Sequence, residues 1–215
     1  MRTRAGVCIL LAWLVTVAPA LAQRAPATAP IGGRIFGVVE GQAMTATDTF
    51  DALSGETSLF GGGGGAEVHG VWRKIFLRAS ASRLSVDGER VFVFGNTVFP
   101  LGIPMRVQLT PVEIVAGWRF ATPGKRLVPY VGAGTVIMRF REESDFDTSS
   151  DIVSKTFSGA VAFAGVDVGV MKFVSVGAEV GMRIIKITRP GGVLGALGED
   201  DLGGVSMRLL VSIGR

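Results

Sequence analysis

The chain has 215 residues, of which 48% are hydrophobic, with 31 glycines and a single histidine. Its formal net charge of +4 comes from scattered basic residues, so no nucleic-acid partner is expected. One histidine excludes a multi-histidine metal centre, and we expect neither metal nor cofactor. High apolarity combined with many glycines, and without a long apolar run after the first 22 residues, favours a β-barrel that shows lipid only every second residue.

The N-terminal stretch has the pattern of a cleavable secretory signal. Arg2 and Arg4 precede an apolar stretch from Val7 to Val17, and the small-residue sequence 20–22 follows it. A retained anchor is the alternative, but the apolar stretch is short for a membrane span. The only cysteine lies inside this stretch, so no disulfide is expected after cleavage. The predicted organisation is a signal peptide at 1–22, a disordered lead-in at 23–30 and one barrel domain at 31–215.

Alternation of apolar and polar residues predicts eight strands, which suit a bilayer crossing when tilted. The last strand is the clearest, because Val205, Met207 and Leu209 alternate with polar Ser206 and Arg208. The predicted strands, in chain order, cover 34–46, 61–69, 75–82, 112–119, 130–140, 158–170, 174–184 and 205–213.

The predicted connections alternate between long and short. The long ones cover 47–58, 87–104, 142–155 and 188–202, and the short ones cover 72–73, 121–128 and 171–173. Short periplasmic turns and long extracellular loops are typical of bacterial outer-membrane barrels. The sequence therefore predicts an all-β, eight-stranded antiparallel up-and-down transmembrane β-barrel with both ends in the periplasm. A soluble secreted lipid-binding barrel, with its apolar side chains inside, is the alternative topology.

Charged residues on the inner side of these strands are the candidate functional residues. A barrel of eight strands is just wide enough inside for side chains to fill. Charges there must pair, because a lone buried ion costs several kcal/mol. A salt-bridged plug is the first interpretation, and a charged path for ions or small solutes is the alternative. The candidate lumen charges are Glu40, Glu67, Arg78, Glu113, Arg139, Asp167, Glu179, Arg183 and Arg208.

Aromatic residues near the strand ends predict girdles at the level of the lipid headgroups. Ordinary core filling is the alternative reading of the same residues. The girdle candidates are Phe60, Trp72, Trp118, Phe120, Tyr130, Phe140, Phe157 and Phe173.

Three motifs that suggest chemistry are discounted. The glycine run Gly61 to Gly65 lacks the preceding apolar strand and following helix of a dinucleotide-binding loop, and a glycine-lined strand is favoured. His69 is interpreted as structural rather than catalytic. The acidic stretch 142–147 lacks the glycine and terminal glutamate spacing of a calcium-binding loop.

Glycine and aromatic placement gives a loose family resemblance. The stretch Pro129 to Gly134, the strand pair 159–187 and the last strand 203–213 resemble the small outer-membrane β-barrel proteins of the OmpA/OmpX-like class. The resemblance covers residues 31–215 and implies an outer-membrane barrel of a Gram-negative-type bacterium. Such barrels usually end in an aromatic residue that the outer-membrane assembly machinery recognises, whereas the sequence ends in Arg215.

The predicted function is a mainly structural or surface-interaction role in the cell outer membrane, without enzymatic activity. Extracellular loops would be presented on a charge-plugged barrel, and the apolar loop residues Phe92, Phe99 and Leu101 favour contact with a partner. The expected partners are outer-membrane lipid, lipopolysaccharide and the assembly machinery, with an unknown surface ligand. A narrow channel or carrier for small or hydrophobic molecules is the alternative. A lipid-directed enzyme built around His69 is a third hypothesis.

Overall fold

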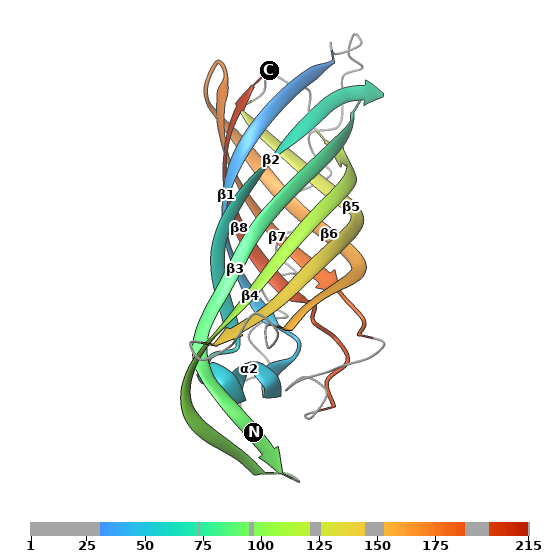
Figure 1. The fold of residues 1–215 in the computed structure, drawn as a ribbon. Coiled ribbons are helices and arrows are strands. Elements are labelled where there is room, and N and C mark those ends of the chain that lie inside the picture. The colour runs from blue at the N-terminus through green and yellow to red at the C-terminus, as the bar shows by residue number, and fades with distance from the viewer. Residues whose placement is uncertain are drawn as a thin grey trace, which may run out of the picture.

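The computed structural model is a closed barrel of eight antiparallel strands, each paired with its neighbour in the chain (Figure 1). It describes residues 31–72, 74–94, 97–120, 126–144, 153–187 and 198–214. The predicted all-β, eight-stranded antiparallel barrel is confirmed, while the predicted signal peptide and lead-in lie outside the described residues. The strands are β1 (Gly32–Met44), β2 (Ser58–Trp72), β3 (Ile75–Phe94), β4 (Thr97–Arg119), β5 (Leu127–Ser144), β6 (Val153–Met171), β7 (Val174–Ile184) and β8 (Gly204–Gly214).

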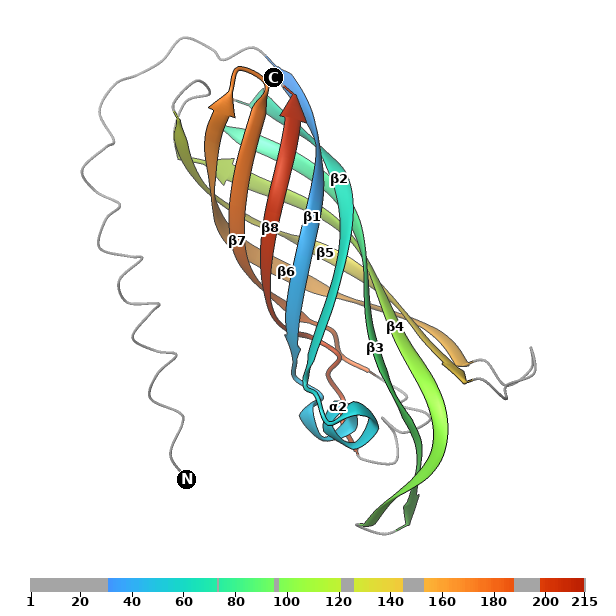
Figure 2. The same ribbon diagram turned by 90° about the vertical axis from the view of Figure 1, so that its left-hand side faces the viewer.

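The strands are strongly staggered around the barrel. We start at Gly214 on β8 and move from each residue to the one directly opposite it on the next strand, beginning with β1. After one turn around the barrel this path returns to β8 at Gly204, ten residues away. Closure with such a stagger requires strands tilted to the barrel axis, and both views show the tilt (Figures 1 and 2). With eight strands, this geometry leaves an interior that side chains can fill completely.

The apolar side of the strands faces outward. Along β8, Val205, Met207 and Leu209 are 51–68% exposed, whereas Ser206 and Arg208 between them are buried. The same alternation runs along β7. The alternative of a soluble barrel with its apolar side chains inside is therefore wrong.

The predicted loop 87–104 is mostly strand. β3 and β4 have 20 and 23 residues, and they continue past the barrel wall as a two-stranded arm (Figure 2). In the arm, Phe92 pairs with Phe99, while a register shift follows Glu89. Sequence alternation missed these residues because Pro100 and Gly102 interrupt the pattern. β5 and β6 likewise extend into the predicted loop 142–155, whose residues 145–152 lie outside the described part, as do 121–125 and 188–197 of two other connections.

The predicted loop 47–58 contains a short helix, α2 (Thr47–Ser54), at the barrel end that carries the long connections (Figure 1). The helix ends at Gly55, whose left-handed backbone (φ 68°) lets its N–H reach the carbonyl of Asp51 at 2.8 Å. Phe50 and Leu53 are buried from the helix toward the barrel interior. Within the described residues, no helix is long and apolar enough to cross a membrane.

The half of the interior beneath α2 is apolar. Leu59, Leu84, Leu109 and Met138 are fully buried and pack with Phe50 into one hydrophobic cluster. Two aromatic residues predicted for the girdles also lie inside, because Tyr130 and Phe140 are 1% and 2% exposed. Phe157 is only partly buried against the same cluster. The remaining girdle candidates, which are Phe60, Trp72, Trp118, Phe120 and Phe173, are exposed as predicted.

Candidate functional site: the charged barrel interior

The other half of the interior, toward the end with the short turns, is filled by charge. Five arginines and five carboxylates, from every strand except β5, form ion pairs there. All ten residues are at most 9% exposed. They are Arg34, Glu40, Glu67, Arg78, Glu113, Arg119, Asp167, Glu179, Arg183 and Arg208. The ten formal charges cancel.

Glu67 on β2 is the centre of the first group. Its carboxylate accepts hydrogen bonds from Arg34 at 3.0 Å, from Arg78 at 2.9 Å and from Arg119 at 2.5 Å. Asp167 on β6 pairs with Arg34 at 2.7 Å and with Arg119 at 2.9 Å. Register explains part of this convergence, because Arg34, Glu67 and Arg78 lie directly opposite one another on three neighbouring strands.

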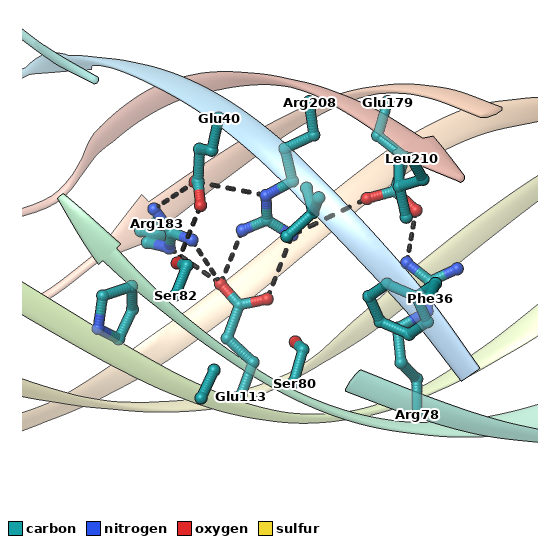
Figure 3. A pocket seen from close by; sticks show the side chains of 13 residues that line it. Phe36, Glu40, Arg78, Ser80, Ser82, Glu113, Glu179, Arg183, Arg208 and Leu210 are labelled. Carbon is teal, nitrogen blue, oxygen red and sulfur yellow. Dashed lines mark hydrogen bonds and ion pairs between the residues drawn. The ribbon is translucent and has the colours of Figure 1, made fainter. Parts of the chain in front are cut away.

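The second group joins two arginines to two glutamates (Figure 3). Arg183 lies 2.7 Å from both Glu40 and Glu113. Arg208 lies 3.1 Å from Glu40 and 2.6 Å from Glu113. The hydroxyl of Ser82 donates a further hydrogen bond to Glu40 at 2.9 Å. Each glutamate is therefore held by both arginines.

Glu179 on β7 connects the two groups. It pairs with Arg78 of the first group and lies 3.7 Å from Arg208 of the second (Figure 3). The hydroxyl of Tyr130 donates a hydrogen bond to the same carboxylate at 2.8 Å. The ion pairs consequently form one continuous network rather than isolated bridges.

Aromatic rings surround the guanidinium of Arg78. Its central carbon lies 4.8–5.4 Å from the ring centres of Phe36, Phe76, Tyr130 and Phe163. Such contacts stabilise a desolvated cation by about 2 kcal/mol or more. Burial among rings and carboxylates fixes this side chain across the lumen.

The glycine run of β2 makes room for these large side chains. A Cβ atom on Gly65 would lie 2.6 Å from the ring of Phe36, and one on Gly63 would lie 2.5 Å from the Cα of Ser82. Side chains at these inner positions would displace the ring or the neighbouring strand. The run is thus a glycine-lined strand, as favoured from the sequence, and does not form a phosphate-binding loop.

Little free space remains within this network. The cavity among Glu40, Glu113, Arg183 and Arg208 has a volume of about 10 Å³. That is roughly the space of one water molecule. Above it, the apolar cluster and α2 fill the lumen. Ion pairs and apolar side chains therefore fill most of the lumen between the described strands.

Eight of the nine candidate lumen charges lie inside, but Arg139 does not. Arg139 is exposed on the outer face of β5, and its Nε donates to the hydroxyl of Ser154 at 3.4 Å. The inner positions of this strand are instead Val136, Met138 and Phe140. They are apolar because they face the cluster beneath α2. On this strand a charged residue therefore did not indicate the inward-facing positions.

Two arginines of the network were not among the predicted lumen charges. Arg119 lies on the inner face of β4, six residues after Glu113 and therefore on the same side of the strand. Arg34 shares the alternation of Glu40 and Gln42 on β1, six residues before Glu40. Extending the period to the ends of both strands would have found them.

His69, the residue on which the enzyme hypothesis rests, has an unpartnered ring nitrogen among the described residues. It lies on β2 near the end with the short turns, opposite Gly32 and Phe76. Its Nδ1 is buried, and within the described residues it has no hydrogen-bond partner. The described residues also contain no group of three or more histidine, cysteine or acidic side chains placed to hold a metal ion.

Solved structures with the same architecture were found, although no protein-family profile and no curated protein sequence matches the chain. The outer membrane protein OprG from Pseudomonas aeruginosa superposes with a TM-score of 0.54 at 13% identity, covering 87% of this chain and 97% of OprG. Ail, the attachment invasion locus protein of Yersinia pestis, solved in complex with the heparin analogue sucrose octasulfate, gives 0.51 at 10% identity, covering 86% and 98%. At such identities the similarity concerns the fold alone. The chain has the fold of the small eight-stranded outer-membrane β-barrels, as the sequence resemblance implied.

Proposed function

We propose that the chain is an outer-membrane β-barrel with a mainly structural or surface-interaction role and no enzymatic activity. In this role a rigid, charge-plugged barrel presents the long connections, α2 and the β3–β4 arm at the cell surface. The observation that carries the proposal is the filled interior, in which ten charged side chains are paired and buried and the cavity among Glu40, Glu113, Arg183 and Arg208 measures about 10 Å³. Such packing favours a structural or surface-contact role over transport.

The outer face supports placement in a membrane. On β8, every second residue from Val205 to Ile213 is apolar and 51–68% exposed. Eleven tilted residues span roughly 25 Å, the height of the apolar band in barrels of this class. Trp72, Trp118 and Phe173 are exposed at the end with the short turns, where a periplasmic girdle belongs.

The arm supports a role in surface contact. Phe92 and Phe99 face each other across its two strands and are 55% and 47% exposed, and Leu101 is 50% exposed. Large apolar side chains on a projecting ribbon suit contact with a partner better than solvation. The arm is therefore the first region in which to search for a surface ligand.

Planar-bilayer conductance tests the filled interior. We expect the mature chain, refolded in detergent and verified by a heat-modifiable gel shift, to give no steady single-channel steps. Arg183→Ala should produce steps, because it removes a large side chain that is 2% exposed and breaks two ion pairs. Arg139→Ala, an outward arginine on β5, is the matched control and should stay silent. Steady steps from the unmodified, refolded protein would favour the narrow channel instead.

A further inference from the structure

The outer face of four neighbouring strands changes from apolar to polar at adjacent positions. On the outer face of β3, Ala79 and Ala81 are followed by Arg83 toward the long connections, and on the outer face of β5, Ile137 is followed by Arg139. β4 and β6 change at Thr110 and Ser158 in the same way. The apolar band therefore ends here, on the side of the long connections.

Arg83 and Arg139 are close neighbours along this boundary. Thr110 pairs with Arg139 in the ladder between β4 and β5. The ladder between β3 and β4 runs without a shift from Ala81 to Leu84, which puts Arg83 opposite Thr110. The Cα atoms of the two arginines are thus two strand spacings apart, about 10 Å. Both side chains are exposed on the same outer face.

Neither arginine forms an ion pair with a carboxylate of the described residues. Higher on the same face, Arg106 pairs with Asp87 at 2.6 Å, and Arg141 lies 3.4 Å from Glu143. Arg139 has only the hydroxyl of Ser154 at 3.4 Å. The arginines above the boundary are therefore neutralised within the protein, whereas the two at the boundary keep their charge for an external anion.

A guanidinium at the edge of an apolar band lies at the level of the lipid headgroups, where it can bind phosphate with two parallel hydrogen bonds. We propose that Arg83 and Arg139, with the Thr110 hydroxyl between them, bind the phosphates of the outer leaflet's phosphorylated glycolipid, lipid A. This inference rests on the proposed function, because it needs the long connections to lie outside the cell. The apolar strands below the site would receive the acyl chains of the same lipid.

Native mass spectrometry of the refolded protein tests the site, with diphosphorylated lipid A, its dephosphorylated form and inorganic phosphate as probes. We expect lipid A to be retained over the dephosphorylated lipid and not to be displaced by inorganic phosphate. Arg83→Gln or Arg139→Gln should weaken lipid A binding about fivefold each, and about 30-fold together, while binding of the dephosphorylated lipid stays unchanged. The double variant Arg106→Gln with Arg141→Gln removes the same charge and should retain lipid A like the unmodified protein.

Three results would overturn the assignment. Equal retention of the two lipids, an unchanged preference in the Arg83→Gln/Arg139→Gln variant, or displacement by inorganic phosphate would each show that the pair does not select this headgroup. A protein that inserts into vesicles and yet shows one of these results loses only the lipid site. A protein that gives no heat-modifiable shift and no insertion into vesicles would remove the proposed membrane function as well.

Discussion

Replacement of Glu67 by glutamine is the sharpest test of the charged interior. Glu67 is 1% exposed and accepts hydrogen bonds from Arg34, Arg78 and Arg119. Neutralising it leaves the five arginines of the network with four carboxylates. Breaking a buried ion pair by removing one partner costs about 3–5 kcal/mol. We expect about 3 kcal/mol, the lower end, because Asp167 and Glu179 still pair with these arginines.

Urea unfolding of the mature protein in phospholipid vesicles measures this loss. Fluorescence of the outward-facing Trp72 and Trp118 reports the departure from lipid. Glu143→Gln is the control, because its half-exposed pair with Arg141 should contribute less than about 0.5 kcal/mol. A Glu67→Gln variant as stable as the control would refute the argument that the ion pairs hold the interior together.

A double-mutant cycle separates pairing from volume. When Arg119→Gln is added to Glu67→Gln, the network regains equal numbers of arginines and carboxylates. The loss in the double variant should then be smaller than the sum of the two single losses, with a coupling of about 0.5–3 kcal/mol. Strictly additive losses would mean that the two side chains act only as filling.

Three further changes test the rest of the barrel. Gly63→Ala places a Cβ 2.5 Å from the Cα of Ser82 and should destabilise by about 1–3 kcal/mol in urea unfolding, whereas Gly37→Ala, with nothing within 4 Å, should be tolerated. Phe50→Ala removes a fully buried side chain and should expose the loop of α2 to protease while the barrel persists, at a cost of about 3–5 kcal/mol. The carboxylate of Glu199 accepts hydrogen bonds from the first-turn amides of α2 at 3.0 and 2.9 Å. Glu199→Gln should lower the stability of this helical turn by about 1 kcal/mol, so these amides should exchange faster with solvent. Unchanged exchange would show that the helix is held by its buried face alone.

Alternation predicted most of the wall because each strand separates lipid from a polar interior. It worked for β7 and β8, where the inner residues Glu179, Arg183 and Arg208 contrast with apolar neighbours. It failed on β5, where Val136 and Met138 inside are as apolar as Ile137 outside. The sequence of a strand that is apolar on both faces does not indicate which face points inward. For this reason Arg139 was predicted on the inner face, although it lies on the outer one.

The parts beyond the wall were harder to predict because no period marks them. α2 has eight residues, about two turns, and its helix is stabilised from outside by Glu199 and by burial of Phe50. Glu199 is about 150 positions away in the sequence, and Leu84, Leu109 and Met138 of the cluster that includes Phe50 lie on later strands. The arm holds Pro100 and Gly102, which resemble loop residues until the pairing of Phe92 with Phe99 is known. Tertiary contacts therefore determine the conformation of α2 and the arm, whereas the local sequence pattern determines the strands of the wall.

The balanced network explains register better than it explains stability. A buried ion pair gains little over a well-packed apolar pair of equal volume, so ten charges are a weak source of net stability. A shift of any strand by one residue would turn its inner side chains outward. For β8 that shift would move Arg208 from Glu40 and Glu113 to the outer face, at about 2–4 kcal/mol near the middle of a bilayer. It would also leave two buried glutamates with one arginine between them. Each strand that carries network charges is thus confined to one register, which keeps the wall closed and holds Arg83 of β3 at its edge.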